Sequence, residues 1–141
     1  MNNDSKGSIL FVDDEVNILT ALRRSIRVLN LEVHTANSAK EEIAILEQQH
    51  IDIVISDKNM PGMGGNEFLQ EIATRWPETV RIMLTAYTEL DSVLDAINTG
   101  RIWSFMQKQW NNNELIITIK QAINYSEILA ERSLLHRTLE Q

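Results

Sequence analysis

The stretch Ser-Ile-Leu-Phe-Val-Asp-Asp-Glu, residues 8–15, decides the fold of this chain. Its apolar part, residues 8–12, is too short for a helix and is typical of a buried parallel strand. Acidic residues follow directly, and behind them apolar side chains recur at helical spacing, at Ile18, Leu19, Leu22, Ile26 and Leu29. The stretch therefore predicts a strand, an acidic strand end and a helix over about residues 15–30.

Further units of the same kind follow along the chain. Short apolar or alternating segments predict strands at residues 31–36, 51–56, 79–84 and 102–106. Helices are expected between them, one of them capped by Ser38 with Glu41 as its capping-box partner, and a long last helix is expected from about Asn113. Because strands and helices alternate, we expect an α/β fold with an open, doubly wound parallel sheet rather than a closed barrel.

Composition limits the classes of function. The chain has 141 residues, no cysteine and a formal net charge of −7. These values exclude a disulfide scaffold and a thiolate metal site, and they argue against direct nucleic-acid binding by this segment. The apolar runs are far shorter than a membrane span, and the first residues carry no apolar signal core. We therefore expect a soluble cytoplasmic domain that does not bind a membrane.

Side chains that can carry chemistry gather at the predicted carboxyl ends of the strands. Asp13 and Asp14 follow the first strand, Asp57 ends the third, Thr85 follows the fourth and Lys108 follows the fifth. In open parallel sheets the functional site forms at this edge, so these side chains should meet there. Clustered carboxylates repel each other, and Mg²⁺, which prefers oxygen ligands, is their natural counter-ion. A carboxylate beside Mg²⁺, a hydroxyl and a lysine could then attack a phosphoryl group.

Each of these residues also has an ordinary structural interpretation. Asp14 could cap the first helix, because aspartate is a favoured N-cap residue. Asp57 could be a turn residue, Thr85 could end a strand, and Lys108 could be a solvated surface charge. Their joint occurrence at neighbouring strand ends favours one common site over separate structural roles.

The chain resembles the receiver domain of two-component response regulators over about residues 8–125. The matching segments are Ile-Leu-Phe-Val-Asp-Asp-Glu at 9–15, Asp-Ile-Val-Ile-Ser-Asp-Lys-Asn-Met-Pro-Gly-Met at 52–63 and Met-Leu-Thr-Ala-Tyr at 83–87, together with Phe105 and Lys108. The resemblance implies a flavodoxin-like fold with five parallel strands in the order 2-1-3-4-5.

The resemblance also implies a phosphorylation site and its metal. Asp57 would accept a phosphoryl group from a histidine kinase. Asp13 and Asp14 would bind Mg²⁺ together with Asp57 and the backbone carbonyl of Asn59. The domain would take part in its own phosphorylation and dephosphorylation without being an enzyme for another substrate.

The remaining implied roles belong to the switch. Lys108 would contact the phosphoryl oxygens, Thr85 would move to hydrogen-bond the phosphate, and Phe105 would be the aromatic side chain that follows it. The family usually has a proline after this lysine, whereas this chain has Gln109. A cis peptide is costly before a residue other than proline, so we expect the bond between Lys108 and Gln109 to be trans.

Two other functions stay open on the residues alone. An aspartyl-phosphate phosphohydrolase would use the same carboxylate chemistry, but it usually has a second acid two residues after the nucleophile, where this chain has Asn59. A phosphate-independent adaptor would not need the full set of site residues, and Gln109 is the feature that favours it.

The expected organisation is a disordered N-terminus over residues 1–7, a receiver domain over 8–125, and a helical extension or linker to an output domain over 126–141. The extension carries Tyr125, Ile128, Arg132, Leu135 and Leu139 at 3-4 spacing, with Leu129 and Leu134 beside them. This spacing predicts that the last helix self-associates into a homodimer. The expected partners are a sensor histidine kinase or phosphotransfer protein and the output domain.

Overall fold

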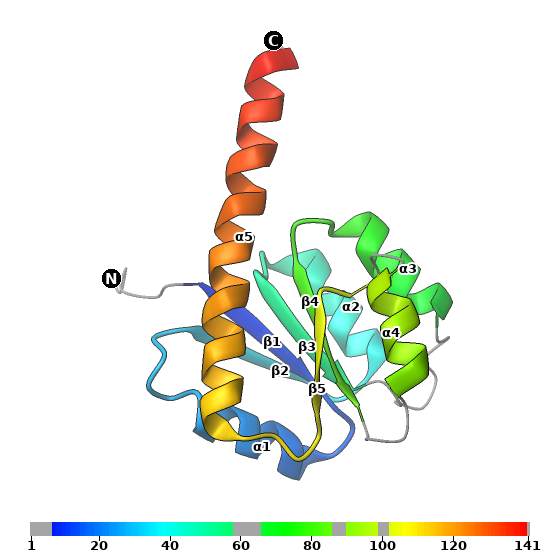
Figure 1. The fold of residues 1–141 in the computed structure, drawn as a ribbon, viewed down its shortest axis with the longest axis vertical. Helices are drawn as coiled ribbons and strands as arrows, with labels where there is room; N and C mark the ends of the chain where they lie inside the picture. The colour runs from blue at the N-terminus through cyan, green and yellow to red at the C-terminus, as the bar shows by residue number, and fades with distance from the viewer. Residues whose placement is uncertain (1–6, 58–65, 86–89, 99–101, 141) are drawn as a thin grey trace.

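The computed structural model describes residues 7–57, 66–85, 90–98 and 102–140, and it places a parallel sheet at the centre of the molecule (Figure 1). The strands are β1 (Ser8–Val12), β2 (Glu32–Ala36), β3 (Ile53–Asp57), β4 (Val80–Thr85) and β5 (Ser104–Gln107). They lie in the order β2-β1-β3-β4-β5, and each neighbouring pair is parallel. The flavodoxin-like fold and its strand order are therefore confirmed.

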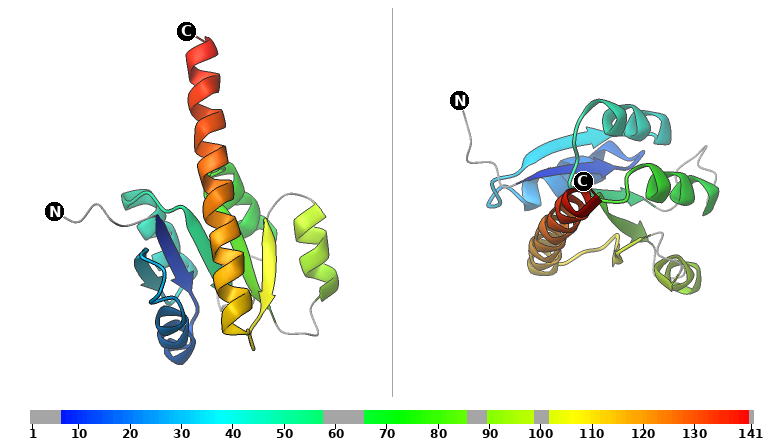
Figure 2. Two further views of the ribbon diagram at one scale, coloured as in Figure 1. Left: turned by 60° about the vertical axis from the view of Figure 1, so that its left-hand side comes forward. Right: turned by 90° about the horizontal axis from the view of Figure 1, so that it is seen from above.

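Helices cover both faces of this sheet (Figures 1 and 2). The helices are α1 (Val16–Ser25), α2 (Ala39–Gln48), α3 (Asn66–Arg75), α4 (Leu90–Asn98) and α5 (Asn112–Glu140). Buried residues of α1 and α5 share one core cluster, whereas residues of α2 and α3 pack in a second cluster and those of α4 in a third. The sheet is therefore enclosed between a layer of α1 and α5 and a layer of α2, α3 and α4.

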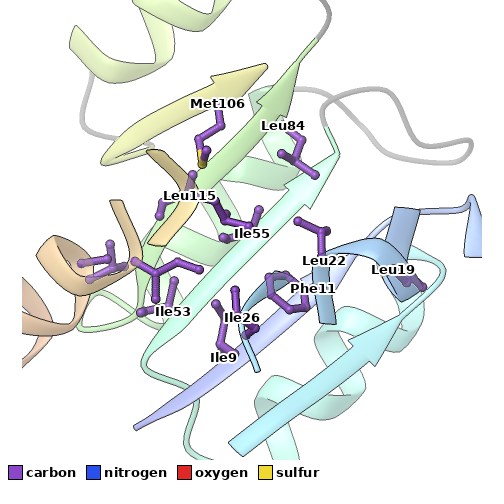
Figure 3. Packing of buried hydrophobic residues seen from close by; sticks show 14 residues of the cluster. Ile9, Phe11, Leu19, Leu22, Ile26, Ile53, Ile55, Leu84, Met106 and Leu115 are labelled. Atoms are coloured by element: carbon purple, nitrogen blue, oxygen red, sulfur yellow. The ribbon is translucent and has the colours of Figure 1, made fainter. Parts of the chain in front are cut away.

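β1 lies in the sheet between the two helical layers, and all its residues are buried. Ile9 and Phe11 point into the cluster beneath α1 and α5 (Figure 3), whereas Leu10 and Val12 belong to the cluster beneath α2 and α3. Each such side chain contributes about 1.5–3 kcal/mol when it is fully buried. The continuous apolar run that predicted this strand therefore reflects burial on two faces.

α1 is shorter than the helical spacing predicts. It ends at Ser25, with Ile26 as its C-cap residue, and the chain continues in turns in which Leu29 N–H donates to the carbonyl of Ile26. Ile26 is nevertheless buried, and Leu29 packs against the same cluster. The apolar periodicity thus reports contact with the core, and that contact continues beyond the last helical turn.

α2 begins as its sequence predicts. The Ser38 hydroxyl accepts a hydrogen bond from the backbone N–H of Glu41 at 3.1 Å, which satisfies one of the free donors of the first turn. The Glu41 carboxylate reaches back and accepts from the backbone N–H of Asn37 at 2.7 Å. The reciprocal bond of this capping arrangement therefore goes to the residue before the N-cap.

α5 has a packed part and a projecting part. Leu115, Ile119 and Ala122 are fully buried against the sheet. The ring of Tyr125 stacks on Trp103 from the segment before β5, with centroids 5.8 Å apart and an interplanar angle of 17°. Beyond this stack the helix continues away from the sheet, as both Figures 1 and 2 show. No helix in the described part of the chain is both long and apolar enough to cross a membrane.

Candidate functional site

The parallel sheet brings the ends of four strands to one edge. Asp13 directly follows β1, Asp57 is the last residue of β3, Thr85 is the last residue of β4, and Lys108 directly follows β5. The backbone N–H of Lys108 donates to the Thr85 carbonyl at 3.0 Å. This bond continues the β4–β5 ladder and fixes the backbone position of Lys108. The site residues expected from the sequence therefore start from neighbouring points of a rigid scaffold.

The Lys108 ammonium lies among carboxylates. Its Nζ donates to Asp57 Oδ2 at 3.0 Å and lies 3.6 Å from Asp13 Oδ2 and 3.9 Å from Glu15 Oε1. Burial lowers the pKa of Lys108, but the hydrogen bond to Asp57 and the charges of the three carboxylates outweigh burial and raise it. The lysine is therefore a fixed positive charge at any physiological pH, and it is not a surface charge.

Asp13 is fully buried and only partly hydrogen-bonded. Its Oδ1 accepts from the backbone N–H of Glu15 at 2.8 Å, whereas its Oδ2 has no hydrogen-bond partner among the described residues. Burial raises the pKa of Asp13, and the nearby charge of Asp57 adds to this rise, while the bond from Glu15 and the charge of Lys108 oppose it. A buried carboxylate oxygen without a donor is costly unless a cation or a proton satisfies it.

The three aspartates form a cluster that fits a divalent cation. Asp13, Asp14 and Asp57 each offer a carboxylate oxygen, and these oxygens lie within 4.8 Å of one another. Asp13 and Asp57 are buried, whereas Asp14 is exposed at the mouth of the cluster. The cluster offers hard oxygen ligands, one of them a buried Asp13 oxygen that accepts no hydrogen bond from the described residues, and it has an open side. These features suit Mg²⁺, which keeps several waters when it binds to proteins.

Asp14 has no capping role in the structure. The N-cap residue of α1 is Glu15, whose carbonyl accepts from the N–H groups of Ile18 and Leu19, and none of the described side chains caps this helix end. The alternative interpretation of Asp14 as a helix cap is therefore wrong. Its place in the acidic cluster is the contact that the structure gives it.

Thr85 and Phe105 lie on neighbouring strands. Thr85 is buried at the end of β4, and Phe105 on β5 pairs in register with Met83. The Phe105 ring is half-buried and packs against the cluster of Met83, Ala96 and Ile102. Phe105 is also one of the residues that line a surface groove with Trp110.

The loop after β5 continues in trans. The described residues contain no cis peptide bond, so the bond between Lys108 and Gln109 is trans, as expected. Trp110 packs against the core cluster, and its Nε1–H donates to Asn112 Oδ1 at 3.1 Å. The lysine therefore reaches the acidic cluster without the peptide geometry that a proline would favour.

Asn59 lies outside the described residues, so its proposed metal contact stays a prediction. Glu42 on α2 was not expected to be buried, yet only 2% of its surface is exposed. Glu15 also received no role, although it lies 3.9 Å from the lysine.

Replacing Asp14 by alanine should weaken Mg²⁺ binding and stabilise the metal-free protein. The loss of a ligand should cost at least about tenfold in affinity, because even partners outside the ligand sphere cost that much. Removing one of three clustered anions also relieves repulsion, so the free energy of unfolding without metal should rise. Mg²⁺ titrations and chemical unfolding measure the two effects, with the exposed Asp95→Asn on α4 as control. An unchanged Mg²⁺ affinity would remove Asp14 from the site.

Comparison with known proteins identifies the family. The response regulator receiver domain family matches residues 9–120. The hydrogenase transcriptional regulatory protein HoxA of Cupriavidus necator is 37% identical over 121 residues, which cover 86% of this chain and 25% of that protein. The DNA-binding transcriptional regulator NtrC of Salmonella typhimurium is 29% identical over 120 residues, which cover 85% of this chain and 25% of that protein.

Solved structures agree in the fold. The signal receiver domain of an HD domain-containing protein from Pseudomonas fluorescens Pf-5 superposes with a TM-score of 0.83 and 31% identity, covering 94% of this chain and 98% of that one. A response regulator receiver domain protein from Clostridium thermocellum gives a TM-score of 0.79 and 33% identity, covering 87% and 98%. The chain spans about a quarter of the length of the curated relatives that it matches. With its parallel sheet, its acidic strand ends and the family match over residues 9–120, this chain belongs to the response regulator receiver domain family.

Proposed function

We propose that this domain is a phosphorylation switch in which Asp57 accepts a phosphoryl group from a histidine kinase or a phosphotransfer protein. The observation that carries the proposal is the position of the Asp57 carboxylate, which is 3% exposed, within 3.0 Å of the Lys108 ammonium and within the acidic cluster. A nucleophilic carboxylate needs cations that neutralise the incoming phosphoryl oxygens. Lys108 supplies one of these charges.

The proposed reaction is a phosphoryl transfer between two protein side chains. A carboxylate oxygen of Asp57 attacks the phosphorus of a phosphohistidine, the new O–P bond forms as the N–P bond breaks, and the electron pair leaves with the imidazole nitrogen. Lys108 is positioned to stay with the phosphoryl group, because its Nζ already contacts Asp57. Asp13, Asp14, Asp57 and the carbonyl of Asn59 would hold Mg²⁺, which would neutralise charge on the transferred group.

The proposed switch runs from β4 to β5. Thr85 would donate its hydroxyl to a phosphoryl oxygen on Asp57, and Phe105 would follow into the space that this movement opens. Both residues lie on paired strands, and Phe105 borders the surface groove beside Trp110. Phosphorylation would therefore change the β5–α5 surface, which is where we place the contact with an output domain.

The proposed domain organisation follows the expected boundaries. Residues 8–125 would form the receiver domain, preceded by the N-terminal segment 1–7 and followed by the extension 126–141. Because the matched residues span only about a quarter of the length of the curated relatives, the extension would connect the receiver to an output domain. Residues 1–141 would themselves bind neither nucleic acid nor a membrane.

Incubation with Mg²⁺ and acetyl phosphate tests the proposal. A phosphate-affinity gel should show a shifted band that requires Mg²⁺, and beryllofluoride should change the tryptophan fluorescence, because Trp110 lies two residues from Lys108. A domain that binds neither reagent would instead act as a phosphate-independent adaptor, the function that Gln109 favours.

The α5 extension should hold two copies of the chain together. Ile128 is 46% exposed on the projecting part of the helix, so it is free to pack against a second copy. The apolar spacing covers about two heptads, so the expected association is weak. Light scattering should give a larger mass for the full chain than for a chain without residues 127–141, and Ile128→Glu should reduce the mass of the full chain. Equal monomer masses in all samples would contradict the idea.

A further inference from the structure

Glu42 is a buried carboxyl that the phosphorylation site does not use. It lies on α2 with 2% of its surface exposed, and its Oε1 has no hydrogen-bond partner in the described part of the chain. Burying a polar group without a partner is costly, and burying it as a charged group is far more costly. A glutamate that persists at such a position should therefore be neutral, and its environment should respond when it ionises.

Glu42 lines a small cavity. The cavity measures about 20 Å³, which is enough for one water molecule. Apart from Glu42 it is bordered by Ser56 on β3, Met83 on β4 and Ile72 on α3. Ser56 directly precedes Asp57, and its hydroxyl donates to the Asp57 carbonyl at 3.4 Å. Residues of α2 and of β3, the strand that carries Asp57, thus border the same cavity.

No described charge compensates an ionised Glu42. Arg81 on β4 also borders the cavity, but its guanidinium donates to the carbonyls of Trp76 and Thr79 at 3.2 and 2.9 Å. The other titratable groups on the elements around the cavity lie on outer faces, at the sheet edge or in the acidic cluster. Among the described side chains they are Lys40, Glu41 and Glu47 on α2, Glu71 and Arg75 on α3, Asp95 on α4, Glu32 and His34 on β2, and Asp57 on β3.

Burial raises the pKa of Glu42 from 4.5 to about 8. The native state therefore keeps a proton between these two pH values that the unfolded chain releases. The contribution of this proton to stability is complete below pH 4.5 and is lost as the pH rises through about 8. A change of this size near neutral pH makes the group sensitive to conditions that a cell can reach.

We propose that Glu42 is a proton-controlled packing residue, which holds α2 closed on the sheet when protonated and loosens α2, and through Ser56 the end of β3, when it ionises. A carboxylate in this cavity must gain water or a donor, and moving α2 outward is the direct way to admit either. The coupling to β3 rests on the proposed function of Asp57. If Asp57 is the phosphoacceptor, a rise in pH would weaken the binding of a phosphoryl group or its analogue at Asp57.

The first test compares the wild type with Glu42→Gln, which keeps the shape of the side chain but cannot ionise, and with Glu42→Met in case the amide variant does not fold. From pH 6 to pH 8 the unfolding equilibrium constant of the wild type should rise about 50-fold relative to either variant. The exposed Glu127→Gln on α5 should follow the wild type. Hydrogen exchange, corrected for the intrinsic effect of pH, should show α2 amides of the wild type losing protection before those of α1. Parallel pH profiles in wild type and variants would overturn the inference.

The second test measures beryllofluoride affinity in Mg²⁺ at the same pH values. We expect the wild-type affinity to fall severalfold relative to Glu42→Gln between pH 6 and pH 8. The coupling to β3 would be overturned if the beryllofluoride affinity of the wild type and of Glu42→Gln changed equally with pH while their unfolding profiles differed. If neither protein binds beryllofluoride at pH 6, the proposed function of Asp57 and with it the coupling are wrong, whereas the unfolding profiles still decide the role of Glu42 in packing.

Discussion

Replacing Asp57 by asparagine should abolish phosphoryl uptake while leaving the fold intact. The amide keeps the size of the side chain and can still lie beside Lys108, but its oxygen is a far weaker nucleophile and it carries no charge for Mg²⁺. With acetyl phosphate and Mg²⁺, the phosphate-affinity shift of the wild type should be absent from the variant. The free energy of unfolding without metal should change little, because the lost pair with Lys108 is offset by reduced repulsion from Asp13.

Asp95→Asn on the exposed face of α4 is the matched control, because it removes the same charge from outside the cluster. It should be phosphorylated as the wild type is. A wild-type shift in Asp57→Asn would show that the phosphoryl group is carried elsewhere and would contradict the assignment of the acceptor.

Replacing Lys108 by alanine should have two large effects with different dependence on Mg²⁺. Phosphorylation should slow by about 100-fold or more, because a fixed cation at the transferred group is lost. Without metal, the variant should also be less stable at neutral pH. The raised pKa of Lys108 means that its stabilising contribution is complete below pH 10.5, its value outside the fold, and would be lost only above the raised value.

Mg²⁺ should restore the stability of Lys108→Ala more than it stabilises the wild type. Without the competing ammonium, the acidic cluster should bind the cation more tightly, and stabilisation grows with the ratio of ligand concentration to Kd. Thermal unfolding with and without Mg²⁺ measures this difference. Lys120→Ala, on the exposed surface of α5, should show neither effect. An equal Mg²⁺-induced shift in the wild type and Lys108→Ala would contradict a direct contact between the lysine and the metal-binding acids.

The parts of the fold that the sequence predicted well are those in which burial alone sets the pattern. β1 covers the predicted residues 8–12 because it is buried on both faces. α1 was predicted too long, since Ile26 and Leu29 keep the apolar spacing while the chain has already left the helix. The periodicity of apolar residues shows which side chains reach the core, but it does not show whether the backbone that carries them is helical.

The site shows the same division. Residues at strand ends could be predicted to meet, because strand direction alone places them, and the structure brings Lys108 within 3.0 Å of Asp57. Glu42 could not be predicted, because its apolar neighbours Ile43 and Leu46 already suggest a normal inner face for α2. Its burial depends on how α2 is rotated against the sheet, and only tertiary packing sets that angle.

The projecting part of α5 is also a mechanical lever. Leu129 still packs against the core, and the eleven residues from Ala130 to Glu140 extend about 16 Å beyond it. A tilt of about 10° at that pivot would move the tip of such a rod by about 3 Å. Movements of β5 that are too small to alter the sheet would thus produce larger displacements at the far end of the helix. These displacements would be comparable to the width of a side chain.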